Sequence, residues 1–166
     1  DSVTDEARTL TRHPDFKGRI TDLGGPTANM YGFECTKKLK SGACRDKRCL
    51  YPGVCKSLQV DHQAQIELLR RVKRIPGVKS VYVSSGIRYD MVLADQQHGR
   101  NYLNEIIREH VSGQLKIAPE HSQPGVLEKM GKPPVDDLVR FKDLFYDLTR
   151  KAGKEQYLTY YLIAAH

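Results

Sequence analysis

Residues 20–55 read ITDLGGPTANMYGFECTKKLKSGACRDKRCLYPGVC, and the rest of the chain is organised around this stretch. It begins with a short apolar strand pattern over 19–23 and turns at Gly24-Gly25-Pro26. It then continues into a basic loop that holds every cysteine of the chain. A strand that leads into a glycine turn is a common position for a cofactor. A loop that holds all the cysteines suggests a metal or redox site.

The length and composition are those of a single globular domain. The chain has 166 residues, which is enough for one domain (1–166) with a real core. No run approaches the roughly 20 apolar residues of a membrane span, and no secretory signal is visible. We therefore expect a cytoplasmic protein that contacts no membrane. The chain starts at Asp1 without a methionine, which is compatible with processing or with a piece of a longer protein.

The net charge of +7 is concentrated between residues 36 and 56. This segment holds seven basic residues against one acid, Asp46, so it carries nearly the whole excess. Cationic neighbours stabilise thiolates, which are the metal-binding form of cysteine. The alternatives are a nucleic-acid patch and a solvated loop; charge alone favours the solvated loop, and the cysteines favour the metal site. The basic residues are Lys37, Lys38, Lys40, Arg45, Lys47, Arg48 and Lys56.

The cysteines follow the spacing C-x8-C-x4-C-x5-C, at Cys35, Cys44, Cys49 and Cys55. The two C-x-x-C pairs of a zinc ribbon are absent, but four thiolates are able to hold zinc or an iron–sulfur cluster. His62 is a candidate substitute ligand. A disulfide pair is less expected in a chain without a secretion signal, and four unliganded cysteines are the remaining alternative.

The order of the expected elements predicts an α/β fold. Strand patterns alternate with helical patterns, which argues for parallel strands joined by right-handed crossovers. The first step between strands is the longest, and we interpret residues 27–60, which hold the cysteines, as an insertion on a regular scaffold. Helices are expected over 5–10, 61–75, 88–111 (broken), 123–130 and 135–152, and strands over 18–23, 81–83, 115–118 and 157–164.

The carboxyl ends of these strands are polar or glycine-rich. Sites in parallel α/β proteins form at this edge, so we expect Arg88, Glu120, His121 and His166 to gather there. Each has a purely structural explanation: Arg88 and Glu120 could form an ion pair, and a lone histidine is most often a surface residue. The coincidence of four such ends favours a site.

Three motifs resemble the later strands of radical S-adenosylmethionine (radical SAM) enzymes: SSGIRYD at 84–90, LKIAPEH at 115–121 and VLEKMGKP at 126–133. Residues 18–166 are similar to a bacterial family of uncharacterised radical SAM proteins. Members of this family share the string DLGGP (22–26), then ANMY (28–31), and a cysteine-bearing insertion after it. More distantly, 115–133 is similar to the RNA and protein methylthiotransferases.

The resemblance implies a partial parallel (β/α) barrel, with about four strands of a (β/α)6 core. The family's defining C-x-x-x-C-x-x-C motif, which holds the [4Fe–4S] cluster that cleaves SAM, has no match in this chain. We therefore expect a fragment that begins after the family's first strand and ends at its fifth.

The resemblance also implies roles for particular residues. Gly24 and Gly25 match the glycine pair whose backbone meets the SAM amino group, although Pro26 stands where an acid often follows. Cys35, Cys44, Cys49 and Cys55 match the position of an accessory metal centre. The remaining strand-end positions that approach SAM or substrate in relatives are Ser84, Ser85, Arg88, Glu120 and His121.

The expected function is therefore part of a radical SAM iron–sulfur oxidoreductase. Such an enzyme reductively cleaves SAM to start radical chemistry on an unknown substrate, for which RNA and protein are two candidates. The fragment would be inactive without the missing segments of its own chain. The alternative is a non-enzymatic α/β module whose basic loop, stapled by zinc, binds RNA. A third outcome is incomplete folding, because an open barrel leaves strand edges unpaired.

Overall fold

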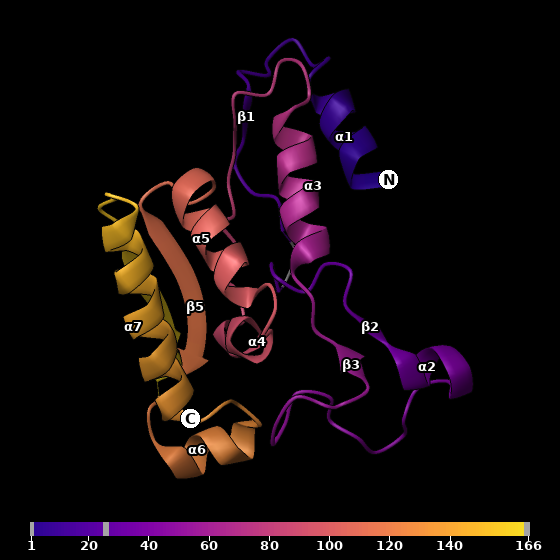
Figure 1. The fold of residues 1–166 in the computed structure, drawn as a ribbon, viewed down its shortest axis with the longest axis vertical. Helices are drawn as coiled ribbons and strands as arrows, with labels where there is room; N and C mark the ends of the chain where they lie inside the picture. Colours follow the sequence, from indigo (N-terminus) through magenta and orange to yellow (C-terminus); the bar gives the residue numbers. More distant parts are fainter. Residues whose placement is uncertain (1, 25–26, 165–166) are drawn as a thin grey trace.

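The computed structural model describes residues 2–24 and 27–164 as a mixed α/β fold (Figure 1). The strands are short and the helices carry most of the packing. The elements are α1 (Ser2–Leu10), β1 (Arg19–Ile20), β2 (Glu34–Cys35), α2 (Thr36–Ser41), β3 (Leu58–Gln59), α3 (Gln63–Lys73), β4 (Ser80–Val81), α4 (Tyr89–Ala94), α5 (Gly99–Glu109), β5 (Gln114–Glu120), α6 (Pro124–Met130), α7 (Val135–Lys151) and β6 (Tyr157–Leu162).

The strands of the scaffold are parallel, as the alternation of elements predicts. β1 pairs with β4, and β5 pairs with β6. A single parallel bridge between Ile87 and Ile117 links the chain after β4 to β5. Because these pairs are short and separate, the described residues form no continuous four-stranded sheet and no closed barrel.

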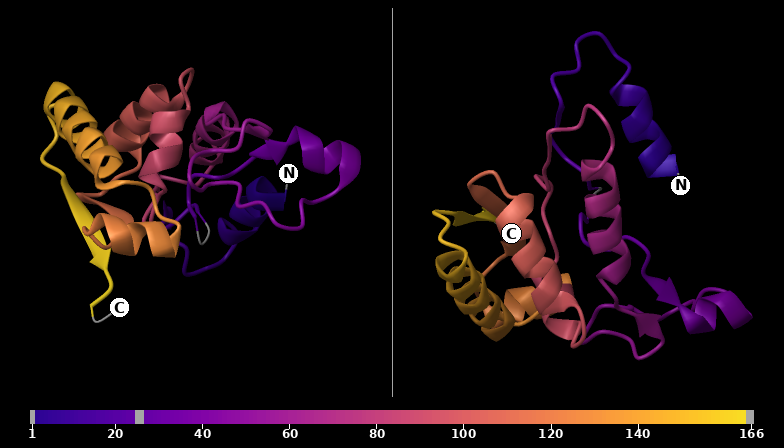
Figure 2. Two further views of the ribbon diagram at one scale, coloured as in Figure 1. Left: turned by 90° about the horizontal axis from the view of Figure 1, so that it is seen from below. Right: turned by 45° about the horizontal axis from the view of Figure 1, so that its top comes forward.

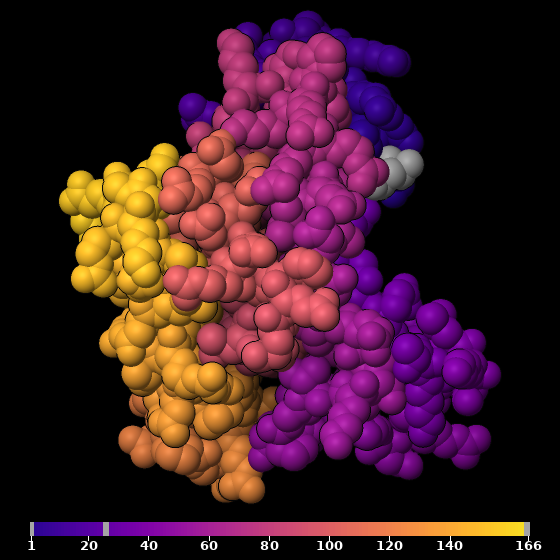
Figure 3. All heavy atoms as spheres, in the orientation of Figure 1, coloured from indigo at the N-terminus to yellow at the C-terminus, as the bar shows by residue number. Residues whose placement is uncertain are grey.

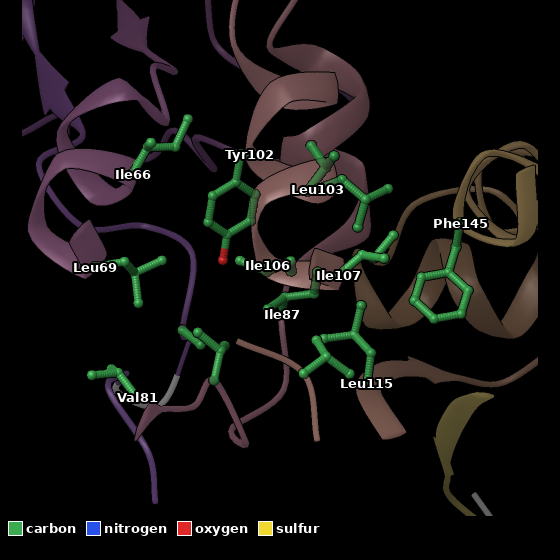
Figure 4. Close-up of a cluster of buried hydrophobic side chains, with 14 of the residues drawn as sticks. Ile66, Leu69, Val81, Ile87, Tyr102, Leu103, Ile106, Ile107, Leu115 and Phe145 are labelled. Atoms are coloured by element: carbon green, nitrogen blue, oxygen red, sulfur yellow. The ribbon is translucent and has the colours of Figure 1, made fainter. Parts of the chain in front are cut away.

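The helices bury one apolar face each against this scaffold. α3 and α5 lie side by side, and α7 packs beside α5 (Figures 1 and 4). Each fully buried aliphatic side chain contributes about 1.5–3 kcal/mol relative to an exposed one, so this cluster stabilises the fold. On the outer face, Arg70 of α3 makes a two-pronged contact to Glu105 of α5 at 2.8 and 2.7 Å. Figure 4 labels Ile66, Leu69, Val81, Ile87, Tyr102, Leu103, Ile106, Ile107, Leu115 and Phe145 in this core.

The region interpreted as an insertion has two parts with different surroundings. Residues 27–33 return to the core, where Ala28 and Asn29 are buried. Residues 34–59, which we call the arm, project from the body in every view (Figures 1 and 2). In the arm, Glu34 pairs antiparallel with Gln59 and Cys35 with Leu58, and α2 follows β2 directly. Neither this antiparallel pair nor α2 was predicted from the sequence.

The arm forms a lobe at the lower right of Figure 3. The tip of the arm nevertheless lies against the body. Tyr51 and Pro52 line a shallow groove together with Pro124 and Leu127 of α6. The cysteine loop therefore lies next to the α6–α7 connection.

The helix boundaries agree with the expected ones to within a few residues. α3 begins at Gln63, and the carboxylate of Asp61 accepts a hydrogen bond from the Gln63 amide at 2.8 Å. Asp61 thus performs the capping role that the sequence predicts for it. Among the described helices, none combines the length and apolarity needed to cross a bilayer.

Candidate functional site

The ends of β1 and β4 are joined by one carboxylate. Asp22 accepts hydrogen bonds from the backbone amides of Ser84 and Ser85 at 2.9 and 3.1 Å, and a further close bond from the Ser85 hydroxyl. The Ser84 hydroxyl donates to the Thr21 carbonyl at 2.6 Å. The two serines therefore reach the edge predicted for them, where their polar groups are held by the protein itself.

A pocket of about 180 Å³ lies at the carboxyl ends of the next strands. Arg88 and Glu120 line it, as predicted, together with Lys132 from the α6–α7 connection. The Arg88 Nε donates to Asp90 at 3.0 Å, and the Lys132 ammonium lies 3.1 Å from Glu120. The ion pair that the sequence suggested between Arg88 and Glu120 does not form, because each residue has a different partner. Two ion pairs thus face one small pocket.

Glu120 has the only left-handed backbone among the described residues other than glycine, with φ of 68°. The amide of His121 donates to the Pro119 carbonyl at 2.8 Å, which closes a three-residue turn around Glu120. Such a conformation costs about 1–3 kcal/mol and persists where the surrounding structure holds it, here through the pairing of Glu120 with Leu162 of β6. The next residue along, His121, is not in the pocket: its Nδ1 accepts from the Gln123 amide at 2.9 Å, at the start of α6.

Gly24 faces a different cavity. It lines an apolar groove of about 440 Å³ between α1 and β1. A Cβ at Gly24 would come within 2.9 Å of the Ala28 Cβ, so close packing against Ala28 explains this glycine. Gly25, which the resemblance pairs with it, lies outside the described residues, as does His166.

Behind the pocket lies a buried polar chain that the sequence analysis missed. The His62 Nδ1 lies 2.8 Å from Asp95, and its Nε2 lies 3.2 Å from the side-chain nitrogen of Asn29. Asn29 in turn bonds the backbone of Arg88 through both atoms of its amide, at 2.7 and 2.9 Å. Both nitrogens of His62 are occupied, so it is not free to bind a metal with the cysteines. Its burial behind Tyr102 carries no sequence signal beyond a histidine at a helix start.

Burial and hydrogen bonding set the charges of His62 and Asp95 in this buried polar network. Burial lowers the pKa of His62, although the neighbouring Asp95 opposes the shift. Burial would raise the pKa of Asp95, but the amides of His98 and His62 and the His62 ring outweigh it and lower that pKa. At neutral pH the pair is therefore a neutral imidazole and a carboxylate.

Asp61, Asp95 and His98 place three potential metal-ligand atoms within 4.8 Å of one another. One oxygen of Asp95 accepts from the backbone amide and ring of His62, and the other accepts from the backbone amides of Gln97 and His98. Both oxygens of this carboxylate are thus fully used. The protein's own donors account for the cluster without an ion.

The four cysteines are free thiols in the arm. In the described part of the chain, no cysteine belongs to a group of three close metal-ligand atoms, so the thiols do not converge on one point. The Cys55 amide donates to the Cys49 carbonyl at 2.8 Å. A hydrogen bond from the backbone of Ser57, aided by the charge of Lys47, lowers the pKa of the Cys55 thiol.

The fold and the site define a mixed α/β protein with a polar pocket at its strand ends, and its close homologues are UPF0313 proteins. The chain is 54% identical over 165 residues to a UPF0313 protein of Fusobacterium nucleatum, covering 99% of this chain and 29% of that protein. It is 46% identical over its full length to one of Clostridium perfringens, of which it covers 25%. It is 48% identical over its full length to one of Methanosarcina acetivorans, of which it covers 22%.

The relatives are therefore much longer proteins, and the chain spans about a quarter of their length. Methanosarcina is an archaeon, so the restriction to bacteria in the sequence analysis is wrong. No family model matches the chain. No solved structure matches it either.

Proposed function

We propose that this chain is a segment of a radical SAM iron–sulfur enzyme and that the pocket between Arg88 and Glu120 forms part of its SAM cleft. The observation that carries the proposal is the convergence on this pocket of all three motifs that resemble radical SAM enzymes. Arg88 belongs to the 84–90 motif, Glu120 to the 115–121 motif, and Lys132 to the 126–133 motif. The strained backbone of Glu120 lies at the same place, where strain is a mark of functional residues.

The small size of the pocket agrees with a site that is only partly formed by this chain. At about 180 Å³ it is smaller than the roughly 300–1,000 Å³ of most small-molecule sites. Other segments of the longer protein would complete it. The C-x-x-x-C-x-x-C motif has no match in this chain, so the cluster would also be held by those segments. When bound, SAM and the cluster supply the radical chemistry.

In the proposal, the pocket residues of this chain bind SAM and orient it. In the proposal, Arg88 and Lys132 offer cationic donors, and Asp90 and Glu120 offer acceptors, to the charged end of the ligand. The two existing ion pairs hold these groups in place before the ligand arrives, which reduces the entropy lost on binding. Behind Arg88, the fully buried and hydrogen-bonded side chains of Asn29 and His62 exclude water from one side of the site.

The test uses the full-length protein, reconstituted with iron and sulfide without oxygen. We expect 5′-deoxyadenosine from SAM, and we expect Arg88→Met and Glu120→Gln to weaken SAM binding by roughly 10- to 100-fold, since a hydrogen bond to a charged group contributes about 1.5–3 kcal/mol. Arg100→Met is the matched control, because Arg100 is exposed and pairs with Asp147 away from the pocket. Unchanged affinity in both pocket variants would remove the pocket from the proposal.

The isolated 166-residue chain supplies a second test. Since it lacks the cluster motif, we expect it to produce no 5′-deoxyadenosine under the same conditions. Robust turnover by this chain alone would contradict the proposal that the cluster lies in other segments.

A second candidate function, RNA binding, is favoured by one observation on the arm. All seven of its basic residues are exposed, and none pairs with a carboxylate within the described residues. Cations of the body, such as Arg70 and Lys151, do have carboxylate partners. Exposed cations without carboxylate partners, on a projecting arm, are suited to a polyanion.

RNA binding would show a steep dependence on salt. For a single strand the logarithmic slope is about −0.7 per phosphate contact, so seven contacts would give roughly −5. We expect Lys37→Gln/Lys38→Gln/Lys40→Gln to reduce the slope by about 2. Lys142→Gln, on α7, is the control and should leave it unchanged. A shallow slope in the unmodified protein would exclude this function.

The metal in the arm stays a prediction of the sequence, since the thiols do not converge in this structure. Metal analysis of protein purified with and without oxygen tests it, with Cys44→Ala/Cys49→Ala as the control. Iron with sulfide would indicate an accessory cluster, and zinc would indicate a structural staple. No metal in either preparation would withdraw the arm as a metal site.

A further inference from the structure

The segment 86–88 forms one wall of the candidate pocket and is held on both sides. On one side, the Ile87 amide donates to the Lys116 carbonyl of β5 at 3.0 Å. On the other side, the Ala28 amide donates to the Gly86 carbonyl at 3.1 Å. The next contact on this side comes from a side chain, that of Asn29.

The amide of Asn29 binds Arg88 as a neighbouring strand would. Its oxygen accepts from the Arg88 amide at 2.7 Å, and its nitrogen donates to the Arg88 carbonyl at 2.9 Å. The Arg88 carbonyl also accepts from Met91 at 3.2 Å. The Arg88 amide depends on Asn29 alone for its hydrogen bond among the described residues. This pairing works in only one orientation of the Asn29 amide.

His62 selects that orientation. The second hydrogen on the Asn29 nitrogen points to His62 Nε2, 3.2 Å away. Nε2 is able to accept only if it carries no proton, which requires the single proton of the neutral ring to sit on Nδ1. Were the Asn29 amide turned over, its oxygen would face the lone pair of Nε2 and its nitrogen would face the Arg88 amide.

Asp95 places the proton of His62 on Nδ1. Its carboxylate oxygen lies 2.8 Å from Nδ1 and also 2.8 Å from the His62 amide, and it accepts from both. The ring itself is held by stacking on Tyr102, with centroids 4.6 Å apart, and by an edge contact with Phe33 at 5.1 Å. His62 and Asn29 are fully buried, so water does not compete for these bonds.

We propose that Asp95, His62 and Asn29 form a positioning relay that fixes the backbone of Arg88 at the wall of the pocket. Each member sets the hydrogen-bond direction of the next: the carboxylate sets the ring, the ring sets the amide, and the amide sets Arg88. With its backbone fixed, the Arg88 side chain leaves the wall at a constant angle and meets Asp90. The importance of Arg88 for a ligand rests on the proposed function; the relay itself does not.

Hydrogen exchange of the Arg88 amide in the full-length protein tests the relay without any ligand. We expect Asn29→Leu to accelerate exchange of this amide by about 10-fold or more, since its hydrogen bond is lost. His62→Phe keeps an aromatic ring beside Tyr102 but removes the acceptor, so we expect acceleration of about 3-fold or more. If Asn29→Leu does not fold, Asn29→Ala, which is smaller and also lacks the acceptor oxygen for the Arg88 amide, replaces it with the same expected direction.

Gln156→Leu is the matched control. Gln156 is also a buried amide that donates to two carbonyls, those of Ile107 and Val111, both at 2.9 Å. We expect this variant to lose stability without a selective change at Arg88. Unchanged exchange in Asn29→Leu, or acceleration there with none in His62→Phe, would overturn the relay. Equal acceleration in Gln156→Leu would show a general loss of stability and would overturn it as well.

Binding of SAM then separates the relay from the proposed function. We expect Asn29→Leu to weaken SAM affinity by about 10-fold in the unmodified protein and by less than about 2-fold when Arg88→Met is already present, because the two act through one contact. If Arg88→Met itself leaves SAM affinity unchanged, the proposed role of Arg88 fails, and the exchange measurement still decides the relay. Equal weakening in both backgrounds would contradict the coupling.

Discussion

The body and the arm of this molecule satisfy their polar groups in different ways. In the body, buried Asp95 has both oxygens bonded and exposed Arg70 has its own carboxylate partner. In the arm, α2 buries no residue at all, and the cations have no carboxylate partner within the described residues. A segment with so little internal packing gains its order from its anchors or from a partner. The body is therefore a packed scaffold, whereas helix α2 of the arm adds no buried residue to it.

The largest difference is expected for matched leucines. Leu69 on α3 is fully buried, and Leu39 on α2 is 70% exposed. We expect Leu69→Ala to lower the free energy of unfolding by about 2–5 kcal/mol and Leu39→Ala to change it by less than about 0.5 kcal/mol. Urea denaturation followed by circular dichroism measures both. A comparable loss in Leu39→Ala would show that the arm is part of the cooperative core.

Matched carboxylates come next. Asp95→Asn places an NH₂ group against N–H donors, so we expect a loss of about 3 kcal/mol in the free energy of unfolding. Asp46→Asn, on the exposed arm, should stay within about 0.5 kcal/mol. The same urea series measures both. If Asp95→Asn is tolerated as well as Asp46→Asn, the buried network contributes little to the body.

The pH dependence of stability is expected to come from the body. Burial lowers the pKa of both His62 and His110 below the ordinary 6.5, so below about pH 6.5 the unfolded chain binds more protons than the folded one. Their contribution is therefore complete above pH 6.5 and is lost as pH falls, by up to about 1.4 kcal/mol per pH unit for each histidine.

Urea midpoints at pH 7.5 and 5.5 measure this loss. The arm (34–59) contains no histidine and should add nothing to it. His13→Ala, at an exposed position, is the control and should leave the pH dependence unchanged. Equal midpoints at the two pH values would mean that these rings accept protons without cost.

The smallest contrast concerns two glycines with positive φ: Gly131 after α6, which is left-handed, and Gly42 after α2, whose ψ of 179° places it in a region that essentially only glycine adopts. An alanine strains Gly131 by about 1 kcal/mol and Gly42 by about 1–3 kcal/mol. At Gly131 the new Cβ would also come within 2.9 Å of the Arg48 side chain, whereas Gly42 has nothing within 4 Å. We expect Gly131→Ala to shift the urea midpoint and Gly42→Ala to affect mainly hydrogen exchange in α2. The reverse order would place α2 in the cooperative unit.

The sequence predicted the body well, because its signals are local. The four-residue spacing of Tyr102/Leu103 and Ile106/Ile107 identifies α5, and the apolar stripe from Ile66 to Ile75 identifies α3. The strand pattern also predicted that Arg88 and Glu120 lie close together, since the ends of parallel strands meet at one edge of a sheet.

The sequence did not predict how the polar residues would pair. Arg88 pairs with Asp90, two residues away, and not with Glu120. His62 is buried in the core and does not lie with the cysteines. Asn29 lies 59 residues from Arg88 and Asp95 lies 33 residues from His62, so no periodicity marks these contacts. The pairing of β2 with β3 was missed because neither strand has a buried residue, so no apolar pattern marks it.

The hydrogen bond between Asn29 and His62 joins two residues that are 33 positions apart. It closes a loop that contains the whole arm. Because the entropy of closing a loop grows slowly with its length, doubling that length costs only about 0.6 kcal/mol. Changes in the length of the arm (34–59) would therefore cost little chain entropy, and the Asn29–His62 bond would still close the loop that contains it.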